Sequence, residues 1–171
     1  MDPDPTERGR REIEAVLAGN RRFVETFDRQ RMDARPRTGL AILACMDTRL
    51  HVEEALGLQA GDAHIIRNAG GLATEDAIRS IVFSEEVLGT DAILVIGHTG
   101  CGLQSRTDAD LHAALIRRTG LDQPIDFGTF DDVATSVRAQ VRRLAEHPWV
   151  RPIPIRGVIY DVETGVLTEV D

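Results

Sequence analysis

The sequence predicts an α/β fold around a mainly parallel β-sheet, and three observations carry this prediction. The run DAILVIGH at residues 91–98 is aliphatic without polar alternation, which is typical of a strand covered on both faces of a parallel sheet. Two further strand-like runs precede it, LAILAC at 40–45 and HIIRN at 64–68, with helical patterns between strands. The length of 171 residues suits a single domain spanning residues 1–171.

The chain before the first strand is predicted to form one helix. Residues 1–6 carry two prolines and two aspartates and are expected to be a disordered tip. Apolar residues then recur at three- and four-residue spacing, which indicates an amphipathic helix whose apolar stripe needs a surface to cover. The stripe comprises Ile13, Val16, Leu17, Phe23, Val24 and Phe27. The polar residues 29–39 follow, with Pro36 and Gly39 as breakers, and lead into the strand at 40–45.

The helices between the strands have recognisable ends. Residues 51–63 indicate a short helix and a turn, and the strand at 64–68 is ended by AGG. Thr74 is a predicted N-cap, followed by acidic residues in the first turn, and Gly89 ends this helix. Its apolar face comprises Ile78, Ile81, Val82 and Leu88.

The C-terminal part is predicted to complete the sheet. Beyond residue 102 the pattern is less regular to about residue 130 and indicates short helices with a loop around QPIDFG. A helix is expected at about 131–147, opened by Asp131 and Asp132 and ended by Pro148. Residues 156–170 then indicate two strands joined at residues 163–165.

Composition and charge exclude several classes of function. The net charge is −8, and all 20 basic residues are Arg without a basic groove, so we expect no nucleic-acid partner. The longest apolar runs are far shorter than the roughly 20 residues of a membrane helix, and the N-terminus lacks a signal pattern. We therefore expect a soluble cytoplasmic protein with no membrane partner, whose two cysteines stay reduced.

Three residues with metal-binding side chains occur at or near strand ends. Cys45 ends the first strand, His98 ends the third, and Cys101 follows His98 by one short turn. Ligands of open α/β sheets bind outside these carboxyl ends, so the three side chains can converge. Two thiolates and an imidazole suit zinc, and three protein ligands leave the fourth position open, as in catalytic zinc sites. Each residue alone is compatible with an ordinary core position, but the combination favours a metal.

Polar and flexible residues accompany these candidate ligands. Asp47 and Arg49 could be a solvated pair on a turn. Beside a zinc-bound water, however, a carboxylate held by a guanidinium can orient the hydroxide, or Asp47 could itself move onto the metal. Gly97, Gly100 and Gly102 could be plain turn residues or could let the backbone approach the metal, with the Gly102 N–H facing an anion. The run RNAGG at 67–71 either forms only a turn or also touches this pocket.

Three motifs together resemble the β-class carbonic anhydrases, in particular their short bacterial members. These motifs are CMDTR at 45–49, HIIRNAGG at 64–71 and HTGCG at 98–102, in this order and spacing. The resemblance implies one Zn²⁺ per subunit on Cys45, His98 and Cys101, with Asp47 and Arg49 as a catalytic dyad. In one family state the carboxylate matching Asp47 also ligates the metal. It further implies a parallel-centred sheet of four strands with an antiparallel edge strand, in a homodimer or tetramer.

The resemblance implies reversible hydration of carbon dioxide to bicarbonate and a proton, by zinc-bound hydroxide that the Asp47–Arg49 dyad orients. His51, His64 and His112 are conceivable proton relays, and none is preferred. Three alternatives remain: a carbon disulfide or carbonyl sulfide hydrolase with the same zinc ligands, a thiol enzyme with Cys101 as nucleophile, and a non-enzymatic zinc-stabilised dimer. The thiol enzyme is disfavoured because Cys101 and Arg106 are separated by four residues, whereas a cysteine-phosphatase loop has five.

Overall fold

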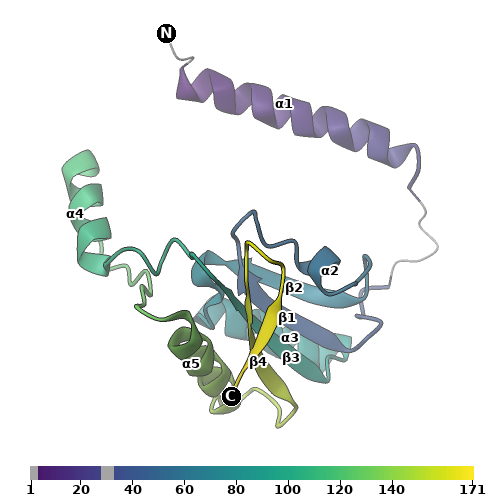
Figure 1. Cartoon of the computed structure of the whole chain (residues 1–171). Coiled ribbons are helices and arrows are strands. Elements are labelled where there is room, and N and C mark those ends of the chain that lie inside the picture. The colour runs from purple at the N-terminus through teal and green to yellow at the C-terminus, as the bar shows by residue number, and fades with distance from the viewer. Residues whose placement is uncertain (1–3, 28–32) are drawn as a thin grey trace. The chain divides into compact units, whose positions relative to one another are not determined.

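The structure is a computed structural model that describes residues 4–27 and 33–171. The chain divides into two compact units, one ending at Met32 and the other beginning at Asp33, and each is described by itself. Figure 1 follows the chain from the N-terminal helix to the C-terminal strand. The prediction of a single domain stays a prediction.

The first unit contains helix α1 (Pro5–Val24), which begins earlier than expected. The Asp4 side chain accepts a hydrogen bond from the Thr6 N–H at 2.9 Å, and Pro5 has a backbone angle already suited to the first helical position. These two features start the helix inside the segment predicted to be disordered, of which residues 1–3 lie outside the described residues. The expected apolar stripe is present from Ile13 to Val24, whereas Phe27 lies beyond the end of the helix, and α1 buries none of its own residues. Among the described residues, no helix is long and apolar enough to cross a membrane.

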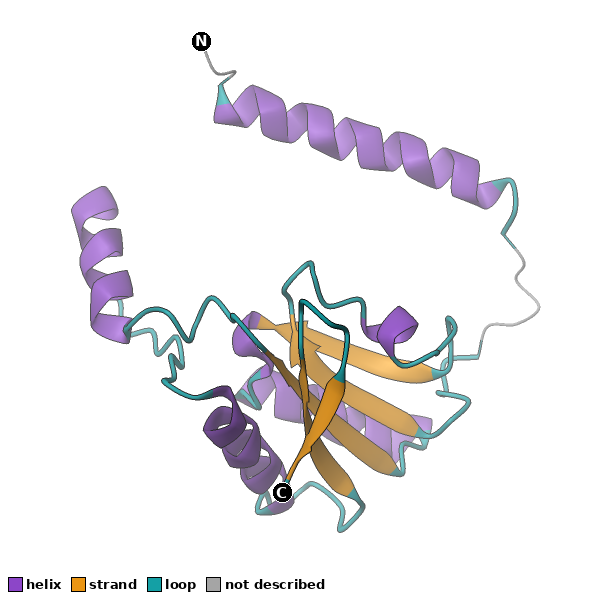
Figure 2. Cartoon of the chain, viewed as in Figure 1, coloured by secondary structure: helices purple, strands orange, loops and turns teal. Residues whose placement is uncertain are grey.

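The second unit is built on a five-stranded sheet with the order β2-β1-β3-β4-β5 (Figures 1 and 2). The strands are β1 (Leu40–Cys45), β2 (Ala63–Asn68), β3 (Ala92–His98), β4 (Ile155–Tyr160) and β5 (Leu167–Val170). Strands β1 to β4 pair in parallel, and β5 pairs with β4 antiparallel. The predicted fold class is confirmed, including the antiparallel edge strand.

Two apolar clusters bury the two faces of the sheet. On one face, helices α3 (Glu75–Leu88) and α5 (Val133–Ala145) pack on alternate residues of the central strands, such as Leu43 and Val95. On the other face, the cluster includes Ile42 and Ile96 together with the loop after β1 and the short helix α2 (Val52–Ala55). Central strands buried on both faces explain why their sequences lack polar alternation.

The predicted helix signals act as expected, with one difference. The Thr74 side chain caps α3 through the Ala77 N–H at 3.3 Å, and Gly89 ends the helix with φ 77°. Residues 103–130, predicted to form short helices, instead contain one 12-residue helix, α4 (Asp108–Thr119). Thr107 and Gly120 supply caps at its two ends, so the helix extends over the whole interval between them.

Two strand glycines let α5 approach the sheet closely. A Cβ added at Gly97 would lie 2.6 Å from a methyl group of Val137, and one at Gly157 would lie 2.5 Å from the other methyl group. Only glycine therefore fits beneath this helix without displacing it. Gly97, which the sequence suggested as a turn residue or a metal neighbour, is instead a packing residue within β3.

Candidate metal centre

Three candidate ligands converge at the carboxyl edge of the sheet. Strands β1 and β3 are parallel neighbours in register from Leu40 and Ala92 onward, so their last residues, Cys45 and His98, reach the same edge. The turn after β3 returns Cys101 to this point. The ligand atoms of Cys45, His98 and Cys101 lie within 4.8 Å of one another, and the three residues are buried.

The three side chains fit a tetrahedral metal such as zinc. Zinc lies about 2.3 Å from thiolate sulfur and about 2.0–2.1 Å from imidazole nitrogen, so ligand atoms this close can share one ion. His98 Nδ1 lies 3.0 Å from the Thr99 carbonyl oxygen, which makes Nδ1 the donor and leaves Nε2 with a free lone pair. His98 Nε2 is buried and has no conventional hydrogen-bond partner among the described residues. A metal would satisfy this atom.

The surroundings of Cys45 lower the pKa of its thiol. Burial alone would raise the pKa of this thiol, but the interactions with His98 and with the N–H groups of Asp47 and Gly70 outweigh burial and lower the pKa to about 7. A hydrogen-bonding interaction with the Cys45 sulfur raises the pKa of His98, although burial alone would lower it. Burial raises the pKa of the Cys101 thiol. A buried Cys101 whose thiol has a raised pKa is a poor candidate for the nucleophile of a thiol enzyme.

Asp47 and Arg49 form a bidentate ion pair beside the cluster. Arg49 Nε donates to Asp47 Oδ1 at 2.9 Å, and Arg49 Nη2 donates to Asp47 Oδ2 at 2.7 Å. Asp47 Oδ2 also lies 3.8 Å from His98 Nε2, so the carboxylate faces the cluster. The hydrogen bonds from Arg49 hold the pKa of the Asp47 carboxyl far below its usual range. Arg49 Nη2 further donates to the Gly100 carbonyl at 3.0 Å, which joins the two loops of the site.

The run RNAGG touches the site as well as forming a turn. Its glycines lie in the 3₁₀ turn η2 (Ala69–Gly71). The Gly70 N–H interacts with the Cys45 sulfur, and a Cβ added at Gly71 would lie 3.0 Å from the Cys45 nitrogen. Arg67 Nε donates to the Cys45 carbonyl at 2.9 Å. The sequence left this contact open because it depends on how the turn after β2 folds back over β1.

Comparison with known proteins agrees with this geometry. The sequence profile of the carbonic anhydrase family matches residues 40–119. Beta-carbonic anhydrase 1 of Mycobacterium tuberculosis is 41% identical over 136 residues, which cover 79% of this chain and 83% of that protein. The chain belongs to the β-carbonic anhydrase family.

Two other relatives show the range of this family. A crystal structure of the carbonic anhydrase of Streptococcus mutans is 43% identical with a TM-score of 0.89, covering 93% of this chain and 97% of that chain. A carbon disulfide hydrolase of Acidithiobacillus thiooxidans is 35% identical over 179 residues, covering 92% of this chain and 88% of that protein. Family membership therefore gives a carbonic anhydrase scaffold and leaves substrate preference to direct measurement.

The remaining predicted residues of this β-carbonic anhydrase have distinct surroundings. Gly102 follows Cys101 at the site, and a Cβ added there would meet no atom within 4 Å. Packing therefore does not require glycine at this position, and the substrate-positioning role of Gly102 stays a prediction. Among the candidate relays, His51 is exposed beside Glu54. His64 lies near the amino end of β2, where its Nδ1 is 2.6 Å from the Ser84 hydroxyl. His112 lies in α4, and its Nε2 is 2.6 Å from the Ile125 carbonyl oxygen. None of these contacts selects a relay.

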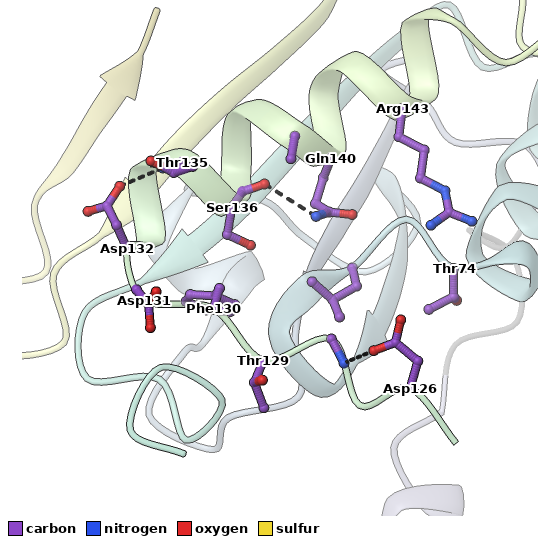
Figure 3. A pocket seen from close by; sticks show the side chains of 13 residues that line it. Thr74, Asp126, Thr129, Phe130, Asp131, Asp132, Thr135, Ser136, Gln140 and Arg143 are labelled. Carbon is purple, nitrogen blue, oxygen red and sulfur yellow. Dashed lines mark hydrogen bonds between the residues drawn. The ribbon is translucent and has the colours of Figure 1, made fainter. Parts of the chain in front are cut away.

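A separate surface pocket of about 520 Å³ is lined by residues from α5, the 126–132 segment and the turn before α3 (Figure 3). None of the predicted site residues lines it. Its polar groups bond within the chain: the Asp132 carboxylate accepts from the Thr135 N–H at 2.7 Å, and Arg143 pairs with Glu75 at 2.7 Å. These bonds cap α5 and join it to α3, so Asp132 and Arg143 have structural roles.

Proposed function

We propose that this protein catalyses the reversible hydration of carbon dioxide to bicarbonate and a proton, with one zinc ion per subunit. Cys45, His98 and Cys101 would hold the metal, Asp47 and Arg49 would act as the catalytic dyad, and Gly102 would position substrate. The observation that carries the proposal is the buried Cys–His–Cys cluster with an arginine-held carboxylate facing it. A purely structural zinc site would not require that carboxylate.

Zinc, when bound, lowers the pKa of a coordinated water and thereby supplies a nucleophile near neutral pH. The chain itself supplies orientation. Asp47 Oδ1 accepts from the Arg49 Nε and N–H groups, whereas Oδ2 accepts only from Arg49 Nη2 among the described residues. A carboxylate oxygen has two lone pairs, so Oδ2 retains one to accept a hydrogen bond from the nucleophile. Arg49 keeps that lone pair fixed because it holds both oxygens.

The ionisation of Asp47 supports the same role. Because the Arg49 hydrogen bonds depress the pKa of the carboxyl, Asp47 is an acceptor at every physiological pH. It therefore orients the nucleophile and does not take up the product proton. In a second arrangement, which we also propose, Asp47 leaves Arg49 and ligates the metal, and the nucleophile is then excluded.

The deciding experiment is stopped-flow hydration of carbon dioxide on protein whose zinc content has been measured. Stoichiometric zinc with no hydration above the buffer rate would overturn the proposal. Cys45→Ser and His98→Ala should lose zinc, because each removes a ligand from the cluster. If either variant keeps stoichiometric zinc and full activity, the ligand assignment is wrong.

Hydrolysis of carbon disulfide or carbonyl sulfide is a second candidate, favoured by the similarity to the hydrolase of Acidithiobacillus thiooxidans. The same cluster and dyad would serve this reaction. Release of hydrogen sulfide, measured on the same zinc-quantified protein, separates the two substrates by the ratio of their kcat/KM values. A higher value for carbon disulfide would reassign the substrate and leave the zinc site in place.

We also propose a cytoplasmic homodimer, which could pair further into a tetramer. The apolar stripe of α1, which the helix does not bury by itself, supports a partner subunit. The two free, buried cysteines are compatible with a reducing compartment.

A further inference from the structure

Arg67 lies on β2 beside the loop that carries Asp47. In the parallel pairing of β1 with β2, Arg67 is opposite Ala44, one residue before Cys45. Its guanidinium donates from Nε to the Cys45 carbonyl at 2.9 Å and from Nη2 to the Asp47 carbonyl at 2.7 Å. One side chain thus joins the main-chain carbonyls of a candidate ligand and of the candidate catalytic carboxylate.

The neighbouring residue extends this attachment. The Met46 N–H donates to the Asn68 carbonyl at 2.9 Å, so residues 45–47 make three successive hydrogen bonds to residues 67–68. Beyond them the loop has an internal bond, from the Leu50 N–H to the Asp47 carbonyl at 3.1 Å, and the bond from Arg49 to the Gly100 carbonyl of the loop after β3. Among the described residues, Arg67 therefore makes the last hydrogen bond that joins β2 to this loop.

The charge of Arg67 is directed at these carbonyls. Within residues 4–27 and 33–171, no carboxylate lies within ion-pair distance of its guanidinium, in contrast to Arg49. Hydrogen bonds from a charged donor are stronger than those between neutral groups, and a planar guanidinium can hold two acceptors in a fixed geometry. Asp47 is consequently held at two ends, with its carboxylate on Arg49 and its carbonyl on Arg67.

We propose that Arg67 is a positioning residue, which fixes the main chain at residues 45–47 so that the Asp47 carboxylate stays on Arg49 and faces the metal cluster. The expected effect of Arg67 on the rate of carbon dioxide hydration rests on the proposed function. Arg67 itself is not proposed to contact the substrate. Without Arg67, the Asp47 carbonyl keeps its hydrogen bond from the Leu50 N–H but loses its attachment to β2. The main chain is then held less firmly, and the carboxylate samples positions from which it cannot orient the nucleophile.

The first test compares Arg67→Gln and Arg67→Lys with Arg79→Gln. Arg79 is a matched control because it pairs with Asp76 on the surface of α3. We expect Arg67→Gln to lose about 10- to 100-fold in kcat/KM for carbon dioxide while keeping stoichiometric zinc, which is the usual size of such supporting effects. Arg67→Lys should recover part of the loss, because an ammonium group can serve one carbonyl well. A fully active Arg67→Gln would overturn the proposal.

A second readout does not depend on activity. Hydrogen–deuterium exchange should increase in Arg67→Gln for the peptide containing residues 46–50 and stay unchanged in α5. Unchanged exchange at 46–50 would overturn the proposal. If the wild-type protein fails to hydrate carbon dioxide, the proposed function fails, and this exchange measurement still decides whether Arg67 holds the loop.

A double-mutant cycle separates positioning from general stability. Arg67→Gln acts through Asp47, so in an Asp47→Asn background it should cause no further loss of kcat/KM. An equal fold-loss in both backgrounds would show that Arg67 acts independently of Asp47 and would overturn the proposal. The melting temperature of each variant, measured alongside, identifies any loss that reflects unfolding.

Discussion

At the scale of single residues, Asp47 combines two requirements that are difficult to meet together. Both oxygens of its carboxylate accept hydrogen bonds from Arg49, yet Oδ2 still faces His98 Nε2 at 3.8 Å. A free carboxylate beside two thiolates would be repelled by them or drawn onto a metal. The guanidinium offsets that charge and fixes the direction of the remaining lone pair. Pairing with Arg49 thus keeps Asp47 available as an acceptor.

Asp47→Asn should keep stoichiometric zinc and lose about 10²-fold or more in hydration rate. The amide replaces one acceptor oxygen with an NH₂ group, so it cannot pair with Arg49 at both positions, and removal of one orienting group of this kind costs about 10²–10³ in kcat. Stopped-flow kinetics with metal analysis measure this effect. Asp62→Asn is the control, since Asp62 pairs with Arg37 at 2.8 Å away from the cluster. Unchanged turnover in Asp47→Asn would exclude the proposed role.

Zinc affinity should depend steeply on pH, because the ligands bind the metal as thiolate and neutral imidazole. The pKa of Cys45 is about 7, the interaction with Cys45 raises the pKa of His98, and burial raises the pKa of Cys101, so the three ligands together hold more protons as the pH falls. Each proton must leave before zinc binds. We expect affinity to fall by more than about tenfold per pH unit below 7, measured by competition with a chelator of known protonation constants. A flat profile would contradict the ligand assignment.

At the scale of elements, the packing of α5 against β3 and β4 determines where His98 lies. Gly97 immediately precedes this ligand, and Val137 occupies the space that a larger residue at 97 would need. Any shift of β3 away from α5 would move His98 relative to Cys45. The precision of the metal cluster therefore depends on a glycine that faces the opposite side of the strand.

Gly97→Ala should destabilise the fold by about 1–3 kcal/mol, the usual cost of inserting one methyl group into a packed core. Chemical denaturation measures this cost, and zinc retention reports the displacement of His98. Val137→Ala in the same chain makes room for the new methyl group, so the double variant should be less destabilised than the sum of the single variants. Gly9→Ala is the control, because a Cβ there meets no atom within 4 Å. Additive effects would show that Val137 does not limit the space.

The sequence predicted most of these elements because their signals are local. Strand ends at Cys45 and His98, the cap at Thr74 and the stop at Gly89 depend on neighbouring residues alone. The contacts of Arg67 and Gly70 could not be predicted, because they depend on the turn after β2 closing over another strand. The position of Gly97 could have been predicted. Alternate residues of a strand point to the same face, so Gly97 lies on the same face of β3 as Ile93 and Val95, which is the face that α5 covers.

At the scale of the whole molecule, α1 carries an apolar stripe that the helix does not bury by itself. The proposed homodimer would cover this stripe. Light scattering should give a mass of twice the 18.8 kDa of one chain. Leu17→Glu should weaken the dimer by at least about 100-fold, because it places an unpaired charge in an apolar contact.

Arg11→Glu supplies the matched control for that experiment. It introduces the same acidic side chain on the polar side of α1, where it should leave the mass unchanged. A wild-type protein with the mass of one chain would contradict the dimer. A Leu17→Glu variant that stays dimeric at low micromolar concentration would instead place the subunit contact elsewhere.

The bond from Arg49 Nη2 to the Gly100 carbonyl has a thermodynamic consequence for the loops it joins. One loop carries Asp47 and the other carries Cys101, and neither can open without losing this charged hydrogen bond. We therefore expect local unfolding of the two loops to be coupled. In mild denaturant, the amides of residues 46–50 and 99–103 should begin to exchange at the same denaturant concentration. This concentration should be lower than the one at which amides of the central strands begin to exchange. Metal retention and catalytic geometry would then be lost in a single step that leaves the sheet folded.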